Sequence, residues 1–511
     1  MRSAAPTRPG PLISGTVAVL VAATFIPLGY VAWAFVTTGW DEAYALIVRP
    51  RVGELLVNTL SLVVLTVPLC VVVGVGTAWL VERTDVPGRP FWRPLFVTPL
   101  AVPAFVNSYA WLGIAPSLHG LGAGVLVTTL SYFPFVYLPA AATLRRLDPA
   151  IEESARALGS NSVGVFFRVV LPQLRLAILG GALLIGLHLL AEYGAFVMLR
   201  FETFTTAIFQ QFQATFDGPA GAMLAGVLVL CCLVLLGAEA GARGSSRLAR
   251  IGGGAARGAV PLSLGRNRFA ALVSLVVLAL LALGVPLWTL ARWLWVGGPD
   301  VWALGALGPA LSQTIGLATV AALVATTLAF PVAWVAVRSE GVLARSVEGA
   351  NYVTSSLPGI VTALALVTVT IRLAPPLYQT VVVVVCAYVL MFLPRALVSV
   401  RAGLAQVPIG LEEASRSLGV PPWATFLRVT LRLTAPSAAA GASLVFVAVA
   451  TELTATLLLA PTGTRTLAMG FWALSSELNY AAAAPYALVM VVLAMPVTMV
   501  LFRQSTKAAA I

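Results

Sequence analysis

The stretch Ile151-Glu-Glu-Ser-Ala-Arg-Ala-Leu-Gly159 returns 260 residues later as Leu411-Glu-Glu-Ala-Ser-Arg-Ser-Leu-Gly419. Each copy carries acidic residues near its start, where they complement the dipole of a helix. Each ends on a glycine, which permits the left-handed backbone that terminates a helix. Long apolar runs flank both copies. The sequence therefore predicts a short polar helix, used twice, between apolar segments.

The repeat extends over most of the chain. Matches lie at an offset of 255 residues until five extra residues after Arg401 raise the offset to 260. At the first offset the pairs are Thr59 with Thr314, Trp79 with Trp334, Arg83 with Arg338, Pro103 with Pro358, Pro139 with Pro394 and Arg146 with Arg401. At the second offset the pairs include Glu152 with Glu412, Glu153 with Glu413, Arg156 with Arg416, Leu158 with Leu418, Gly159 with Gly419 and Glu192 with Glu452. These matches indicate an internal duplication.

The composition is that of a membrane protein. Of the 511 residues, 59% are hydrophobic and 10% are charged, against roughly 45–50% apolar residues in a soluble domain. Uncharged runs of about 20 residues are long enough to cross a bilayer as a helix. Twelve such runs occur: Pro11–Val36, Leu55–Val81, Leu95–Pro116, Leu121–Leu144, Leu176–Leu199, Gly221–Leu236, Phe269–Leu290, Thr314–Val337, Tyr352–Ile371, Leu377–Leu393, Ser437–Leu459 and Ala481–Phe502.

We therefore expect an all-α polytopic membrane protein with twelve transmembrane helices. Six spans separate equivalent features, so the two six-helix repeats are parallel, and a pathway at their interface is the natural interpretation. A duplicated bundle without a pore is the alternative. The predicted domains are a first half at 1–242, a linker rich in Gly, Ser and Arg at 243–268, and a second half at 269–511. The polar loops cover 145–175 and 401–436.

The basic residues predict an orientation. With the N-terminus in the cytoplasm, only six of the 31 lysines and arginines face outward, and the other 25 face inward. This asymmetry is the one that the positive-inside rule requires. The six outward residues are Arg49, Arg51, Arg200, Arg292, Arg372 and Arg465. Both termini and the linker are thus expected in the cytoplasm.

Several functions are excluded by what the sequence lacks. The formal charge of +12 comes from scattered basic residues without interleaved aromatics, so no nucleic-acid partner is expected. The four cysteines lie in apolar runs, and the two histidines, His119 and His188, are not spaced as a metal or triad pair. The only lysine is Lys507, so the phosphate-binding G-x-x-x-x-G-K-[ST] motif is missing. We expect no catalytic residue, metal site or cofactor in this chain.

The two polar loops resemble a motif of bacterial ATP-binding-cassette importer permeases. That motif reads Glu-Ala-Ala, three residues, Gly, nine residues, Ile, one residue, Leu-Pro. The first loop matches it with Glu153-Ser154-Ala155, Gly159, Val169, Leu171 and Pro172. The second loop matches with Glu413-Ala414-Ser415, Gly419, Val429 and Leu431, but has Arg432 in place of the proline. The departure affects only the return of the chain into the membrane.

This resemblance implies the type I importer permease fold, with both halves fused, in the bacterial cytoplasmic membrane. In the family the loop docks into a cleft on an ATPase subunit. The resemblance therefore implies two copies of a P-loop ATPase, which would bind ATP and magnesium, and an extracytoplasmic substrate-binding protein. The implied docking residues are Glu152, Glu153, Ala155, Arg156, Leu158, Gly159, Glu412, Glu413, Ala414, Arg416, Leu418 and Gly419. Leu158 and Leu418 are expected to share one helix face with Ala155 and Ser415.

Two matched acids lie inside the fifth spans. Glu192 and Glu452 are each about 16 residues into their span, where a charge costs about 2.5–3.5 kcal/mol and usually faces a cavity or a partner. We expect Glu192, Tyr193 and Glu452 to line the pathway. A structural ion pair and a position at the outer interface remain alternatives.

The cargo is the least determined property. The Glu-Tyr-Gly sequence at Glu192 and the stretch Thr205-Thr206-Ala207-Ile208 look like those of iron(III) and thiamine importer permeases. That resemblance favours iron(III), with thiamine, polyamine and phosphonate as alternatives. A twelve-span secondary transporter is the alternative from a different class. Such transporters carry a basic motif between spans two and three that begins with a glycine. The segment Glu82–Arg93 is basic but lacks this leading glycine and the spacing of the motif.

Overall fold

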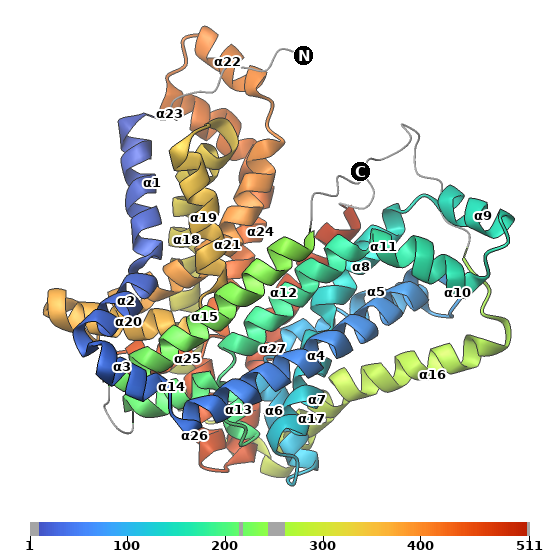
Figure 1. Cartoon of the computed structure of the whole chain (residues 1–511), viewed down its shortest axis with the longest axis horizontal. Coiled ribbons are helices and arrows are strands. Elements are labelled where there is room, and N and C mark those ends of the chain that lie inside the picture. Colours follow the sequence, from blue (N-terminus) through green and yellow to red (C-terminus); the bar gives the residue numbers. More distant parts are fainter. Residues whose placement is uncertain (1–9, 214–217, 244–260, 508–511) are drawn as a thin grey trace. The chain divides into compact units, whose positions relative to one another are not determined.

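The computed structural model describes residues 10–213, 218–243 and 261–507 (Figure 1). Within these ranges the fold consists of helices and their connections, with one isolated parallel bridge between Thr84 and Leu262. Residues 244–260 of the predicted linker, and the terminal residues 1–9 and 508–511, lie outside the described ranges. The predicted all-α class is confirmed.

The chain forms two compact units, and each contains segments from both sequence halves. Unit 1 comprises the described residues of Met1–Ile47, Gln211–Val229 and Trp302–Leu478. Unit 2 comprises those of Val48–Gln210, Leu230–Val301 and Asn479–Ile511. The compact units therefore do not coincide with the predicted halves. The first apolar segment of each half packs in the unit that holds most of the other half.

The helices of unit 1 are, in chain order, α1 (Pro11–Thr24), α2 (Ile26–Thr38), α3 (Trp40–Ile47), α18 (Leu304–Arg338), α19 (Val342–Ser356), α20 (Gly359–Leu373), η6 (Pro375–Leu377), α21 (Val381–Ala405), α22 (Ile409–Ser417), α23 (Pro422–Thr425), η7 (Phe426–Thr430), α24 (Leu431–Ala450), α25 (Thr454–Leu459) and α26 (Leu467–Ser476). Helices α14 (Phe204–Gln213) and α15 (Gly218–Arg243) contribute residues to both units.

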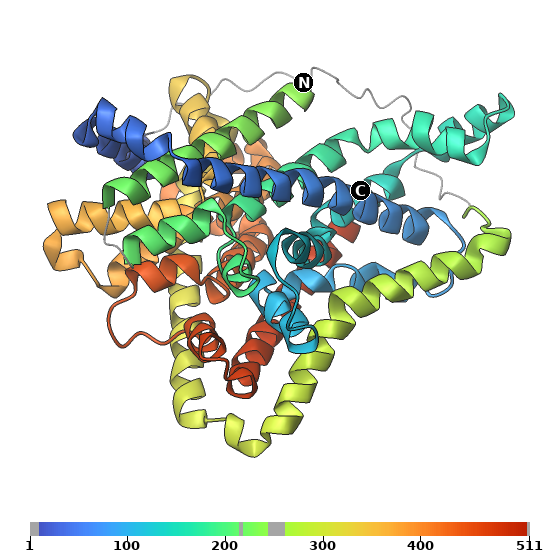
Figure 2. The same ribbon diagram turned by 60° about the horizontal axis from the view of Figure 1, so that its bottom comes forward.

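The helices of unit 2 are α4 (Pro50–Arg83), α5 (Arg89–Leu95), η1 (Thr98–Ala101), α6 (Ala104–Ile114), α7 (Gly120–Tyr132), α8 (Pro134–Arg146), α9 (Pro149–Ala157), α10 (Ser162–Val165), η2 (Phe166–Val170), α11 (Leu171–Gln173), α12 (Arg175–Ala191), α13 (Gly194–Met198), η3 (Gly265–Asn267), α16 (Arg268–Ala279), η4 (Leu280–Gly284), α17 (Val285–Gly297), η5 (Pro299–Val301) and α27 (Tyr480–Lys507). Figure 2 shows α16, η4 and α17 as one long yellow-green rod.

The centre of each unit is a triad of helices that are equivalent in the repeat. Helices α4, α8 and α12 pack together in unit 2, and α18, α21 and α24 pack together in unit 1. Matched glycines bring the backbones close: a Cβ on Gly181 would lie 2.8 Å from the carbonyl oxygen of Phe135, and one on Gly441 would lie 3.2 Å from that of Ala396. Small residues at such crossings are typical of helix packing in membranes.

Eight helical segments of the described chain are long and apolar enough to cross a membrane. Four further pairs of helices are bent at short breaks, by 47° (α1 and α2), 95° (α5–η1 and α6), 66° (α10–α11 and α12) and 104° (α19 and α20). Counting each bent pair as one span gives twelve, in agreement with the sequence.

The predicted third spans are wrong in one respect, because each contains a sharp bend. Within the predicted span Leu95–Pro116 the helix breaks at Val102 and Pro103, and within Tyr352–Ile371 it breaks at Leu357 and Pro358. A proline has no N–H to donate and keeps the preceding residue extended, so a helix stops before it.

The predicted fifth spans are also interrupted. Helix α12 ends at Ala191 and α13 begins at Gly194, while α24 ends at Ala450 and α25 begins at Thr454. Glu192 and Glu452 therefore lie in breaks between helices, not inside a continuous helix. Hydropathy does not detect these breaks, because the residues on both sides of each break are uncharged.

Candidate functional site

Each polar stretch forms a helical hairpin at the end of its unit's central helices (Figure 1). The first hairpin consists of α9, α10 and η2, and the second consists of α22, α23 and η7. Both η2 and η7 are π-helical, and they occupy matched positions at an offset of 260 residues. Such π-turns are rare and are often found at functional sites. The repeat therefore reproduces even the irregular backbone of the hairpin.

The turn of each hairpin depends on its glycine. Gly159 has a φ of +88° and Gly419 a φ of +80°, in the left-handed region. The N–H of Ser160 donates to the carbonyl of Ala155 at 3.1 Å, and the N–H of Val420 donates to that of Ser415 at 3.2 Å. This is the hydrogen-bond pattern of a Schellman motif. A Cβ at either glycine would meet no atom within 4 Å, so the turn is open to an approaching partner.

Exposure in the two hairpins agrees position by position. From 151 to 160 and from 411 to 420, each residue is buried, half-buried or exposed exactly as its counterpart is. The leucines before the glycines are the most exposed large apolar side chains of the hairpins, with Leu158 at 87% and Leu418 at 83%. Three further exposed apolar pairs are Ile151 with Leu411, Val163 with Trp423, and Phe167 with Leu427.

We call these eight side chains the apolar set. Exposed apolar groups that gather on one element mark an interaction surface. The sequence prediction included only Leu158 and Leu418. Ile151 and Leu411 open the matched stretches themselves, and the other four could have been found by extending the 260-residue offset beyond Gly159 and Gly419.

The first glutamate of each hairpin is an anchor. The carboxylate of Glu152 lies 2.8 Å from the guanidinium of Arg83, at the end of α4, and 3.4 Å from that of Arg156. The side chains of Glu152 and Arg83 are 9% and 4% exposed. Removing one partner from such a buried pair leaves an uncompensated charge, which is strongly destabilising. Glu152 therefore holds α9 on α4 and does not face outward.

The second hairpin has an equivalent but different anchor. Glu412 lies 3.6 Å from Arg338, at the end of α18, and also accepts a hydrogen bond of 2.9 Å from the hydroxyl of Thr430. Arg338 donates to the carbonyl of Val407 at 2.8 Å. The sequence matched Arg83 with Arg338 but did not pair either arginine with an acid.

The remaining predicted docking residues divide by exposure. Ala155 is half-buried and packs on the core of unit 2, and Ser415 is half-buried with its hydroxyl 3.0 Å from that of Thr425. The expectation that they share an outward face with Leu158 and Leu418 is wrong, because the helix turns them toward its partner helix. The exposed members are Glu153, Arg156, Leu158, Gly159, Glu413, Ala414, Arg416, Leu418 and Gly419.

In the first half, the predicted pathway acid caps a short helix. Glu192 accepts from the N–H of Ala195 at 3.0 Å and from the hydroxyl of Tyr132 at 2.8 Å. Its own carbonyl accepts from the hydroxyl of Thr205 at 2.5 Å. Tyr193 is buried, with its ring 4.4 Å from that of Phe209. These bonds hold the break between α12 and α13 in place.

Glu452, the matching acid of the second half, also caps a short helix, but a cation lies near it where Glu192 has the hydroxyl of Tyr132. Glu452 accepts from the N–H of Ala455 at 2.9 Å, and its carbonyl accepts from the hydroxyl of Thr456 at 3.1 Å. Its carboxylate lies within electrostatic range of the guanidinium of Arg395 in α21. Arg395 is exposed, halfway along α21, with its guanidinium 5.0 Å from the ring centre of Phe392. The sequence missed Arg395 because the predicted span ended at Leu393.

Metal ligation by side chains is not evident at either break. Among the described residues, no group of three or more His, Cys, Asp or Glu side chains is placed to hold a metal ion.

The fold and the paired hairpins define a duplicated multi-pass membrane protein with two hairpins of equivalent exposure. The family of binding-protein-dependent transport system inner membrane components matches the chain twice, at residues 43–239 and 325–506. The chain belongs to this family. It is thus a multi-pass inner membrane protein and the membrane component of an importer of the ATP-binding-cassette class.

Individual relatives support the same assignment. The Fe(3+)-transport system permease protein FbpB 2 of Haemophilus influenzae is 36% identical over 473 residues, which cover 91% of this chain and 93% of that protein. The sulfate transport system permease protein CysT of Salmonella typhimurium is 26% identical over 41% of this chain and 83% of its own length. A probable molybdenum permease of Haloferax volcanii is 26% identical over 42% and 86%.

Proposed function

We propose that this chain is the complete membrane pathway of an ATP-driven iron(III) importer, with each hairpin docked on one ATPase subunit. The observation that carries the proposal is the duplicated apolar set. Two surfaces with exposed apolar side chains at the same positions suit two copies of one partner. Leu158 and Leu418, next to open glycine turns, would enter a groove on that partner as helix-borne anchors do.

Energy would come from outside this chain. The sequence has no phosphate-binding lysine motif, so ATP and magnesium would be bound by a separate P-loop ATPase, in two copies because there are two hairpins. An extracytoplasmic binding protein would deliver the cargo. The distribution of basic residues supports cytoplasmic hairpins and cytoplasmic termini.

The hairpins would transmit motion through their anchors. Nucleotide-driven closure of the ATPase pair would move α9 and α22, and the pairs Arg83–Glu152 and Arg338–Glu412 would carry that movement into α4 and α18. Exchange between outward and inward openings then follows as a shift between two states. Glu192, Tyr193 and Glu452 would act at the breaks of the fifth spans, beside or within the pathway.

The cargo assignment rests on the relative from Haemophilus influenzae, whose name states Fe(3+) transport and which aligns over nearly the whole chain. The sequence around Glu192 and Thr205 supports the same cargo. Isolated carboxylates suit a passage that must release iron, since a complete ligand cage would retain it.

Uptake of radioactive iron into right-side-out membrane vesicles tests this proposal. With the binding protein supplied, we expect right-side-out vesicles to accumulate iron only when loaded with ATP, and an excess of thiamine, spermidine or phosphonate to leave the rate unchanged. Uptake that survives ATP depletion and stops when the proton gradient is dissipated would indicate a secondary transporter. Competition by one of the organic compounds would identify it as the cargo instead.

A further inference from the structure

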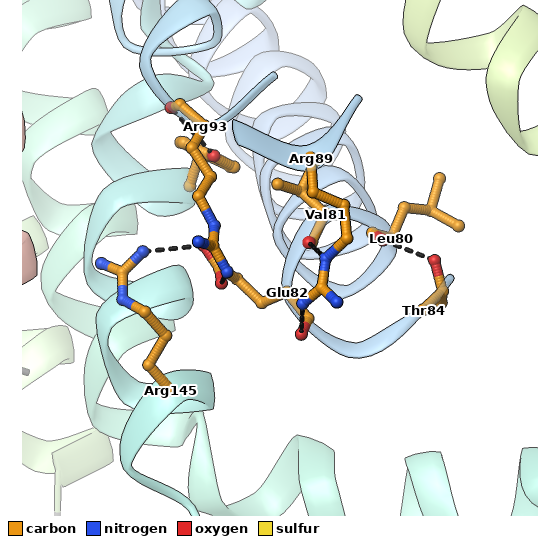
Figure 3. Close-up of polar contacts among 8 residues, drawn as sticks. Leu80, Val81, Glu82, Thr84, Arg89, Arg93 and Arg145 are labelled. Carbon is orange, nitrogen blue, oxygen red and sulfur yellow. Dashed lines mark hydrogen bonds and ion pairs between the residues drawn. The ribbon is translucent and has the colours of Figure 1, made fainter. Parts of the chain in front are cut away.

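A buried cluster of charges lies beside the first hairpin (Figure 3). Glu82, one residue before the end of α4, has a side chain that is 1% exposed. Its carboxylate accepts from Arg93 of α5 at 2.9 Å and from Arg145 of α8 at 2.7 Å. One buried carboxylate thus joins three helices. Charge-assisted bonds of this kind are the strongest hydrogen bonds available to side chains.

The end of α4 is bonded further by its neighbours. Arg89 donates to the carbonyls of Val81 at 2.8 Å and Glu82 at 2.6 Å, which a helix end otherwise leaves without partners (Figure 3). The hydroxyl of Tyr137 in α8 donates to the carbonyl of Arg93 at 3.2 Å. The connection between α4 and α5 is therefore fixed at both ends.

The next residue, Arg83, carries the network into the hairpin. It lies 2.8 Å from Glu152 of α9 and donates to the carbonyl of Leu147 at 3.4 Å. Consecutive side chains of α4 thus bind α5 and α8 on one side and α9 on the other. We call Glu82, Arg93 and Arg145 the clamp.

The second half has no equivalent of the clamp. At an offset of 255, Val337, Glu348 and Val400 stand in the places of Glu82, Arg93 and Arg145. Glu348 forms a single pair of 2.9 Å with Arg401, and both side chains are about half exposed, at 49% and 46%. Exposed pairs contribute little to stability, because water and salt screen them. This pair also joins α19 to α21 without including α18.

We propose that the clamp makes the first hairpin move as one body with α4, α5 and α8, whereas in the described part of the second half Arg338 links the hairpin to α18 without a buried carboxylate that joins α18 to α19 and α21. The two hairpins would then have equal docking surfaces but unequal roles in transmission, and Glu82 is a positioning residue for coupling in the first half. The inference rests on the proposed docking of ATPase subunits. It concerns how movement of the ATPase subunits reaches the spans, not whether the subunits bind.

The test compares Glu82→Gln with Glu348→Gln in the full transporter complex, purified with its ATPase and reconstituted in liposomes. We measure the ATPase subunits that co-purify, ATP hydrolysis, and iron transported per ATP. For Glu82→Gln we expect normal ATPase association and continued hydrolysis, with iron per ATP lower by about tenfold. Glu348→Gln should stay within about twofold of the wild type.

A transplanted variant covers the case in which Glu82→Gln does not fold. The combination Glu82→Val, Arg93→Glu and Arg145→Val gives the first half the pattern that the second half already packs, so it should fold and yet transport little iron per ATP. Unchanged coupling in both Glu82 variants, or an equal loss in Glu348→Gln, would overturn the inference. A wild-type chain that purifies without any ATPase would instead contradict the proposed function.

Discussion

Two kinds of region occur twice in this chain, and their copies agree to different degrees. The hairpins match in element order, turn geometry and the exposure of every residue from 151 to 160 and from 411 to 420. The breaks in the fifth spans share the carboxylate cap and a threonine hydroxyl that donates to the glutamate carbonyl, but their other partners differ. Glu192 is bonded to the neutral hydroxyl of Tyr132, whereas Glu452 lies within electrostatic range of the cation Arg395.

The difference follows from what each region would contact. Two copies of one ATPase, as proposed, would require equivalent surfaces on the two hairpins, which would keep the hairpins alike. A single cargo on a single path does not require twofold chemistry, so the breaks are free to differ. Matched substitutions should therefore have equal effects in the two hairpins and unequal effects in the two breaks.

The largest effect is expected from the anchors. Arg83→Ala leaves Glu152 buried without its main partner and should lower the free energy of unfolding by about 3–5 kcal/mol. Arg338→Ala should cost less, because Thr430 still donates to Glu412. Thermal unfolding in detergent measures both. The control is Arg401→Ala in an exposed pair, expected within about 1 kcal/mol of the wild type; an equally small loss in Arg83→Ala would contradict the anchor.

The glycine turns should respond equally in the two halves. Gly159→Ala and Gly419→Ala each place a side chain at positive φ, at a cost of about 1–2 kcal/mol, and each puts a methyl group where the partner would approach. We expect similar losses of stability and of ATPase retention on purification. Gly463→Ala, with a φ of +91° and open surroundings, is the matched control. Gly463→Ala should lose stability but retain the ATPase. Clearly different losses of ATPase retention in Gly159→Ala and Gly419→Ala would contradict the equivalence of the two hairpins.

The breaks should respond unequally. Glu452→Gln leaves Arg395 without a counter-charge and should reduce the initial rate of iron uptake by about tenfold. Glu192→Gln should change it by about threefold at most, since the amide oxygen still accepts from the N–H of Ala195 and the amide NH2 can donate to the hydroxyl oxygen of Tyr132. Radioactive iron uptake at equal protein levels decides. Equal effects, or no effect of Glu452→Gln, would show that the two breaks serve the same role.

The smallest effect concerns the start of the first hairpin. Asp148 caps α9 by accepting from the N–H of Ala150 at 3.0 Å, whereas its counterpart Pro408 has no side-chain cap. Asp148→Ala should destabilise α9 by about 1 kcal/mol. Amide hydrogen exchange should therefore become faster in α9 and stay unchanged in α22 of the same sample. Faster exchange in both would mean that the hairpins are not independent.

Much of this architecture could be predicted from the sequence. The spans, the repeat and the hairpins each leave a local pattern: apolar runs of membrane length, matched residues, and a polar helix that ends on glycine. The bends at Pro103 and Pro358 could also have been predicted, because proline stops a helix. In the sequence, these two prolines were used only as a matched pair of the repeat.

The rest depends on contacts that no local pattern contains. The exchange of first segments between units is long-range packing. Glu152 and Glu412 were expected among the docking residues from their place at a helix start, yet an arginine more than 60 residues earlier holds each one inside. Arg395 was assigned to a loop because a charge ends a hydropathy window, although the helix continues through it.

The most direct test of the account is the number of ATPase subunits bound to the purified chain, measured by native mass spectrometry. We predict two for the wild type, one for Leu158→Glu or Leu418→Glu alone, and none for the double variant. Leu373→Glu, at a leucine that is equally exposed but outside the hairpins, should retain both. Two bound subunits in the double variant, or loss of both in only one of the single variants, would contradict docking through two equal hairpins.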